Sequence, residues 1–187
     1  SQKQLPGFSI SLVDNDKVIW AKGFGFQDAD QKVPATADTV FRVGSVSKLF
    51  TDIALLQLVE EGKIDLDSPV QTYLPDFAPN NPSGIQITLR QLMSHQSGLV
   101  RESPIGNYFD PSEPTLAQTV ASLNGTTLVY SPQTKTKYSN AAIAVVGAVL
   151  EKQLDVSHPE QVRTKILAPL GMDSSSFIVT PAIDPNL

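Results

Sequence analysis

The stretch Ser45-Val46-Ser47-Lys48 stands where a helical pattern begins. Apolar residues follow at steps of three and four, and Gly62 predicts where the helix stops. Residues three positions apart share a helix face, so Ser45 and Lys48 are expected to project together from the first turn. Most other early positions are apolar or small, which predicts a helix buried on nearly all sides. The periodic apolar residues are Val46, Leu49, Phe50, Ile53, Leu56 and Val59.

The pairing of Ser45 with Lys48 suits nucleophilic catalysis. A serine hydroxyl attacks a carbonyl only when a base removes its proton. Burial of a lysine favours its neutral amine, and the positive end of the helix dipole acts in the same direction, so Lys48 is the candidate base. A histidine relay would instead have to recruit His95 or His158 from elsewhere. A Ser-x-x-Lys spacing arises roughly once by chance in such a chain, so a helix cap beside a solvated lysine is the alternative.

A second polar group, Tyr138-Ser139-Asn140, precedes an apolar helix predicted to end near Leu154. A tyrosine whose pKa is lowered by an ammonium group can carry a proton between nucleophile and leaving group. The amide of Asn140 can hydrogen-bond both a lysine ammonium and a substrate carbonyl. The alternative is a Ser139/Asn140 helix cap beside a packed Tyr138.

Composition excludes several classes of function. With 187 residues, of which 41% are hydrophobic and 18% charged, the chain is predicted to be a globular protein with one sizeable core. A net charge of −5 and scattered basic residues argue against nucleic-acid binding. The absence of cysteine excludes thiol catalysis, zinc-thiolate sites and disulfides. The two histidines lie far apart in the sequence, so no histidine metal site is predicted.

The remaining pattern predicts a hairpin followed by a mostly helical region. Two strands do not make a stable sheet alone, so either helices cover the hairpin or further strands of the fold lie outside this chain. Trp20, Phe24 and Phe26 are expected in the core. The predicted strands span 8–13 and 17–25, and the later helices span 89–95, 116–123, 141–154 and 159–167.

The two motifs together resemble the serine β-lactamase and penicillin-binding protein family, especially its class C β-lactamase, DD-peptidase and esterase branch. Its signatures are Ser-x-x-Lys at the start of a buried helix and Tyr-x-Asn farther along, which match residues 45–48 and 138–140. The resemblance covers almost the whole chain. Three flanking stretches are also similar: Thr39-Val40-Phe41-Arg42-Val43-Gly44, Glu61-Gly62-Lys63-Ile64-Asp65-Leu66-Asp67-Ser68-Pro69-Val70 and Leu92-Met93-Ser94-His95-Gln96-Ser97-Gly98-Leu99.

This resemblance implies an α+β fold of the β-lactamase/DD-peptidase type, in which helices flank an antiparallel sheet beside a mostly helical lobe. It implies that Ser45 is the acylated nucleophile and Lys48 its basic partner. Tyr138 becomes the proton relay, and Asn140 contacts the substrate and the lysine. The implied reaction is acyl transfer from a small amide, lactam or ester, with no metal or organic cofactor.

One family signature is missing. A Lys or His followed, after one residue, by Gly marks a sheet strand that supplies an oxyanion-hole N–H in the family, and neither His95-Gln96-Ser97 nor His158-Pro159-Glu160 matches it. We therefore expect residues 1–187 to form a single incomplete domain. Its hairpin and lead-in span 1–44, and its catalytic helix and helical lobe span 45–187. The C-terminal sheet strands are absent from this chain, and a second chain could carry them.

The resemblance leaves the exact activity open. A β-lactamase, a D-alanyl-D-alanine carboxypeptidase and an esterase all pass through the same acyl-enzyme, so the substrate is a small molecule or a peptide. A penicillin-binding sensor that is acylated with little turnover and a catalytically inactive structural module are the other functions. The family's cell-wall substrates imply a periplasmic or secreted protein, and a start at Ser1 without methionine is compatible with removal of a signal peptide. A cytoplasmic esterase is the alternative.

Overall fold

The computed structural model describes residues 5–30, 32–180 and 183. The chain divides into two compact units after Gly44. The described residues from Met172 onward group with the N-terminal unit, whereas the sequence placed them in the helical lobe. That the two units belong to one incomplete domain stays a prediction.

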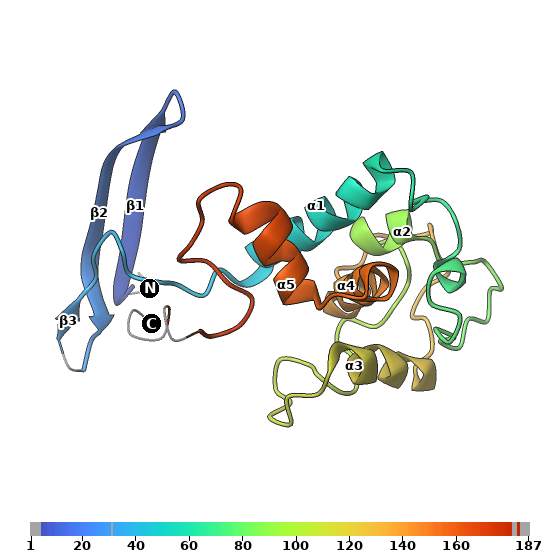
Figure 1. Cartoon of the computed structure of the whole chain (residues 1–187). Helices are drawn as coiled ribbons and strands as arrows, with labels where there is room; N and C mark the ends of the chain where they lie inside the picture. The colour runs from blue at the N-terminus through green and yellow to red at the C-terminus, as the bar shows by residue number, and fades with distance from the viewer. Residues whose placement is uncertain (1–4, 31, 181–182, 184–187) are drawn as a thin grey trace. The chain divides into compact units, whose positions relative to one another are not determined.

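The N-terminal unit contains the predicted hairpin (Figure 1). Strands β1 (Gly7–Asp14) and β2 (Lys17–Asp28) pair antiparallel. Asn15 and Asp16 join them with φ of 47° and 61°, the positive values that a two-residue hairpin turn requires. A third strand, β3 (Val33–Pro34), pairs with β2 and gives the order β1-β2-β3. Two residues are too few to show an alternating pattern, so β3 could not be predicted from the sequence.

The hairpin aromatics are more exposed than expected. Trp20 and Phe26 keep 40% and 41% of their surface accessible, and Phe24 keeps 36%. Phe24 stacks on Phe8, with ring centroids 5.1 Å apart, and lies 6.3 Å from the Trp20 ring. The prediction that these rings lie in a core is wrong because the described regular elements of this unit are strands only, and one sheet layer encloses no core.

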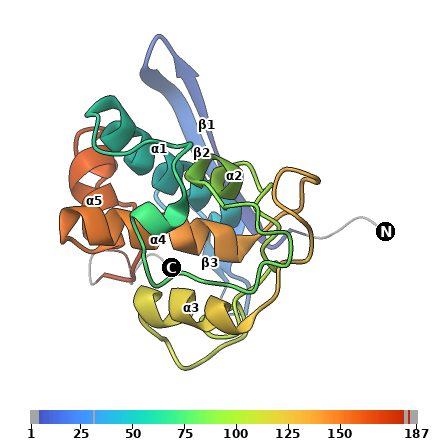
Figure 2. The same cartoon turned by 90° about the vertical axis from the view of Figure 1, so that its right-hand side faces the viewer.

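The second unit, Ser45–Gly171, is helical and is built around α4. Helices α1, α2, α3 and α5 all contact α4, and both views place α4 between α2 and α3 (Figures 1 and 2). Nine of the fifteen residues of α4 are buried. The helices are α1 (Ser47–Glu60), α2 (Leu89–Met93), α3 (Leu116–Ser122), α4 (Asn140–Leu154) and α5 (His158–Val162), and α5 continues as a wider turn over Arg163–Leu167. This confirms the α+β class and the predicted helices, except that α2 ends before His95.

Helix α1 is buried on one side only. Its buried residues are Thr51, Ala54, Leu55 and Leu58, on the side that meets α4 and α5. The opposite side exposes Leu49 by 60%, Ile53 by 44% and Leu56 by 42%. The prediction of burial on nearly all sides is therefore wrong, because no described element of this unit covers that second face.

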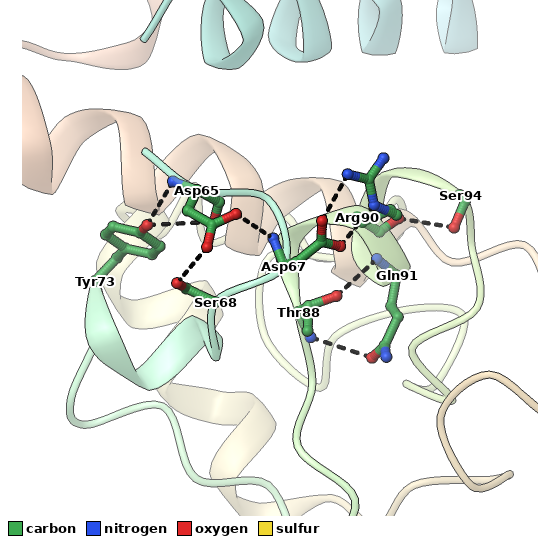
Figure 3. Close-up of polar contacts among 8 residues, drawn as sticks. All are labelled: Asp65, Asp67, Ser68, Tyr73, Thr88, Arg90, Gln91 and Ser94. Atoms are coloured by element: carbon green, nitrogen blue, oxygen red, sulfur yellow. Dashed lines mark hydrogen bonds and ion pairs between the residues drawn. The ribbon is translucent and has the colours of Figure 1, made fainter. Parts of the chain in front are cut away.

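The segment between α1 and α2 is held by polar contacts (Figure 3). Asp67 forms a bidentate ion pair with Arg90, in which Nε lies 2.6 Å from Oδ1 and Nη2 lies 2.8 Å from Oδ2. The hydrogen bond from Arg90 keeps the pKa of Asp67 below its usual value. The Thr88 side chain accepts from the backbone N–H of Gln91, whose side chain accepts from the Thr88 N–H. This reciprocal cap sets the start of α2. Helix α2 in turn leads into residues 95–102, which border the candidate site.

Among the described residues, no helix is long and apolar enough to cross a membrane.

Candidate active site

Ser45 lies in a tight turn, Gly44–Val46, that runs directly into α1. Gly44 has φ +54°, a conformation that costs little for glycine and more for other residues. The turn leaves Ser45 exposed, so its hydroxyl is open to an incoming carbonyl.

Two side chains donate hydrogen bonds to the Ser45 hydroxyl. Lys48 Nζ lies 3.0 Å from Ser45 Oγ, and the Tyr138 hydroxyl lies 2.6 Å from it. Lys48 reaches Ser45 from the same helix start, whereas Tyr138 comes from 93 positions away. The structure thus brings together the three residues that the sequence singled out for catalysis.

Tyr138 sits in an electropositive environment. Lys48 Nζ lies 5.0 Å from its ring centroid and the Arg101 guanidinium 5.4 Å. Burial opposes ionisation of the phenol, but the interactions with Lys48 and Ser45 and the charge of Arg101 outweigh it, so the pKa of Tyr138 lies below its usual value of 10. A phenol with a lowered pKa accepts and returns a proton more readily at neutral pH.

The start of α4 fixes the position of Tyr138. Ser139 is the helix cap: its Oγ accepts from the Ala142 N–H at 3.0 Å and donates to the Val100 carbonyl at 2.6 Å. The Asn140 N–H donates to the Arg101 carbonyl at 2.8 Å. Ser139 therefore does act as the cap that the alternative interpretation foresaw, and the same capping interaction places Tyr138 against Ser45.

Asn140 pairs with an acidic residue that the sequence did not single out. Its Nδ2 donates to Glu102 Oε1 at 2.7 Å, and Arg101 lies 3.4 Å from the same carboxylate oxygen. Because both hydrogens of an amide sit on nitrogen, this bond turns Nδ2 toward Glu102 and leaves Oδ1 to accept from another donor. The contact of Asn140 with Lys48 stays a prediction.

His95 supports the site from behind Tyr138. Its ring centroid lies 4.4 Å from the Tyr138 ring, and its Nδ1 accepts from the Ser139 N–H at 3.3 Å. Burial, followed by the charge of Lys48, lowers the pKa of His95, which favours the neutral ring that can accept this bond. This hydrogen bond joins two residues that lie 44 positions apart in the sequence.

Gly98 holds the supporting segment close to its neighbour. It has φ +77°, and a Cβ there would collide with the Tyr130 carbonyl oxygen. The close approach allows the Val129 N–H to donate to the Gly98 carbonyl at 2.8 Å. His158, the other histidine, is engaged elsewhere: its Nε2 lies 3.0 Å from Thr51 Oγ1, a contact between α5 and α1.

This arrangement suits stabilisation of an anionic serine oxygen. An alkoxide forming at Ser45 would meet an ammonium and a phenol at hydrogen-bond distance and would lie at the N-terminal side of α1, where the helix dipole favours negative charge. No cluster of three or more potential metal ligands occurs within residues 5–30, 32–180 and 183.

Comparison with known proteins identifies the family. The beta-lactamase family profile matches residues 1–187. The chain belongs to the beta-lactamase family. Two curated relatives are "Beta-lactamase-like protein 2" of Dictyostelium discoideum, 34% identical over 183 residues, and "Protein flp" of Staphylococcus aureus, 31% identical over 174 residues. Each alignment covers 92% of this chain but only 33% and 35% of the relative, so the chain spans about a third of their length.

Solved structures of family members share the fold. EstCE1, a hydrolase with promiscuous acyltransferase activity, is 32% identical with a TM-score of 0.78, over 89% of this chain and 47% of its own. The D-amino acid amidase of Ochrobactrum anthropi is 28% identical with a TM-score of 0.76, over 90% and 46%. The beta-lactamase/D-alanine carboxypeptidase of Yersinia pestis is 27% identical with a TM-score of 0.84, over 97% and 53%. Relatives of this chain are thus hydrolases, and it carries the N-terminal part of their fold.

Proposed function

We propose that this protein is a serine hydrolase that forms an acyl-enzyme on Ser45 from a small amide, lactam or ester. The observation that carries the proposal is the pair of hydrogen bonds from Lys48 and Tyr138 to Ser45 Oγ. An exposed serine that only caps a helix has no need of a lysine and of a tyrosine from 93 positions away.

In the proposed reaction, Ser45 Oγ attacks the substrate carbonyl carbon while its proton moves to the Lys48–Tyr138 pair. The C–O bond to Ser45 forms and the bond to the leaving group breaks, and Tyr138 returns the proton to the departing nitrogen or oxygen. Water then hydrolyses the ester on Ser45 and restores the hydroxyl. This assignment makes Ser45 the nucleophile, Lys48 its basic partner and Tyr138 the relay.

Asn140 is proposed to bind the substrate. Its Nδ2 is held by Glu102, so its Oδ1 is available to accept from an amide N–H of the substrate or from Lys48. Asn140 follows Tyr138 by two positions at the start of α4, which supports a role beside the reacting carbonyl.

The substrate class is proposed broadly because the relatives differ. Their names include a hydrolase with promiscuous acyltransferase activity, a D-amino acid amidase and a beta-lactamase/D-alanine carboxypeptidase. Cleavage of a β-lactam, a D-alanyl peptide or a simple ester would use the same Ser45 chemistry, and the walls of the substrate cleft would decide among them.

We further propose that the remaining part of the fold is needed for full activity, supplied either by the same protein or by a second chain. The exposed face of α1, with Leu49, Ile53 and Leu56, supports this, since apolar helix faces are normally covered. So does the missing Lys/His-x-Gly signature, because loss of one oxyanion donor costs about 10²–10³ in rate. We also propose that the protein is exported to the periplasm or secreted. A cytoplasmic esterase is the alternative.

Turnover assays on the purified protein would test the proposal. The substrates would be an activated acyl ester, a chromogenic cephalosporin and a D-amino acid amide, each measured with the native protein and with Ser45→Ala. We expect hydrolysis of at least one substrate that Ser45→Ala abolishes. Rapid acylation followed by little turnover would favour the sensor function. Equal activity of the native protein and Ser45→Ala would refute the role of Ser45.

A further inference from the structure

A groove lies at the end of α4 opposite the Ser45 site. It has a volume of about 560 Å³ and is bordered by α3, by the last turns of α4 and by the segment Leu74–Phe77. Ligand pockets typically have about 300–1,000 Å³, so this groove has the size of one. Tyr138 and Asn140 lie at the start of α4, whereas the groove involves Ala148 to Asp155, about 12–22 Å farther along the helix axis.

The groove has an apolar floor and small side chains on its walls. Phe77, Val120 and Ala148 are buried at its base, with 2%, 7% and 8% of their surface exposed. Ala117 and Ala121 line it from α3. Both side chains are single methyl groups, which leave space in the groove that larger side chains would fill.

Hydrogen bonds hold one wall in place. Asn124 Oδ1 accepts from the Ala78 N–H at 2.7 Å, and its Nδ2 donates to the Asp76 carbonyl at 2.7 Å. These two bonds tie the segment that carries Asp76 and Phe77 to the turn that follows α3. The groove is therefore bounded by braced backbone and by two packed helices, which favours a site formed before a ligand arrives.

The rim carries more negative than positive charge. Asp76, Glu151 and Asp155 line the groove together with a single basic residue, Lys152. The carboxyl end of α4 lies at the same place, and the negative end of a helix dipole adds to the attraction for a cation. Glu151 also accepts from the His158 N–H at 2.8 Å, so Asp76 and Asp155 are the carboxylates more free to face a ligand.

We propose that this groove binds a small amphipathic organic cation, an ammonium group on an aryl or alkyl body. The apolar body would cover Phe77, Val120 and Ala148, and the ammonium would lie at the rim near Asp76 and Asp155. An anionic ligand of the same shape is disfavoured by the same carboxylates. The site is separate from Ser45 and does not depend on the proposed acyl-enzyme chemistry.

Calorimetric titration of the purified protein with three matched probes tests this site. Phenylbutylammonium, phenylbutanol and phenylbutyrate share one apolar body and differ in charge. We expect saturable binding of the ammonium, weaker binding of the alcohol and none of the carboxylate. The double variant Asp76→Asn/Asp155→Asn should weaken ammonium binding by roughly tenfold and leave the alcohol unchanged, because each exposed charge pair contributes only modestly.

Matched variants make the result specific. Glu60→Gln removes an exposed carboxylate from α1, outside the groove, and should bind the ammonium like the native protein. Ala121→Phe fills the groove from α3 and should abolish binding of both the ammonium and the alcohol, with Ala117→Phe as a second blocking variant if the first does not fold. Equal binding of ammonium and alcohol, an unchanged affinity in the double variant, or no saturable binding of any probe would overturn the proposal.

Discussion

Replacing Asp52 by asparagine should stabilise the protein at neutral pH and leave it nearly unchanged in acid. Asp52 lies one helical turn after Lys48 on α1. Its Oδ1 is buried and accepts no hydrogen bond from any described residue. Burial raises the pKa of the Asp52 carboxyl from 3.8 to about 6, although the charge of Lys48 acts in the opposite direction. An ionised carboxylate in this place therefore costs stability.

The size of the effect follows from this pKa. A rise of about two units corresponds to an upper bound of about 3 kcal/mol. Because Asp52 is only partly buried, water screens it, and we expect about 1–2 kcal/mol. The folded state holds the proton more tightly than the unfolded state, so this carboxyl lowers the free energy of unfolding as pH rises from about 4 to about 6. The loss is complete above pH 6 and absent below pH 4.

Urea unfolding of the native protein and of Asp52→Asn across this pH range measures the difference directly. The variant should gain about 1–2 kcal/mol above pH 6, and the gain should shrink toward zero near pH 4. Glu60→Gln, an exposed carboxylate on the same helix, is the control and should show no such pH-dependent gain. A difference that does not vary with pH, or an Asp52→Asn protein less stable at neutral pH, would show that the buried charge of Asp52 does not destabilise the folded protein.

Three further changes test the site and its support. Tyr138→Phe removes the hydroxyl that is hydrogen-bonded to Ser45 but keeps the ring contact with His95. We expect kcat/KM to fall by about 10²–10⁴-fold while the midpoint of thermal unfolding hardly moves. An unchanged kcat/KM would exclude Tyr138 as the proton relay. Glu102→Ala should raise KM because it releases the Asn140 amide. Glu102→Gln still offers an acceptor to Asn140 and should bring KM back to the native value. Equal KM values for both variants would contradict a role of Glu102 in positioning Asn140. Gly98→Ala should lower the free energy of unfolding in urea by more than about 2 kcal/mol, because the new Cβ meets a backbone oxygen. Gly84 has a similar φ but open space around it, so Gly84→Ala should lower the free energy of unfolding by only about 1 kcal/mol. Equal losses for the two variants would contradict the close approach at Gly98.

The part of the site that local geometry determines could be predicted from the sequence. Ser45 and Lys48 meet because they are three positions apart at a helix start, a relation that spacing alone contains. Tyr138 could be assigned to the same site only through the family resemblance, since 93 positions separate it from Ser45. The helices were predicted from apolar periodicity, and their ends shifted by a few residues where capping set them.

The supporting contacts could not be predicted, because they are tertiary. Glu102 and Asn140 are 38 positions apart in the sequence, and His95 and Ser139 are 44 positions apart. No short sequence spacing predicts either hydrogen bond. The exposed face of α1 was missed for a related reason. Apolar periodicity shows which residues prefer burial, but the partner that would bury Leu49, Ile53 and Leu56 is not among the described elements of their unit.

Intact-mass spectrometry of the purified protein, before and after exposure to a penicillin or an activated ester, shows whether Ser45 is the acylated nucleophile. We expect a mass increase equal to one acyl group, located on the peptide that contains Ser45 and absent from Ser45→Ala. The starting spectrum also shows whether a second chain accompanies the protein. An adduct on another residue, or an adduct that survives Ser45→Ala, would contradict the assignment of Ser45 as the nucleophile.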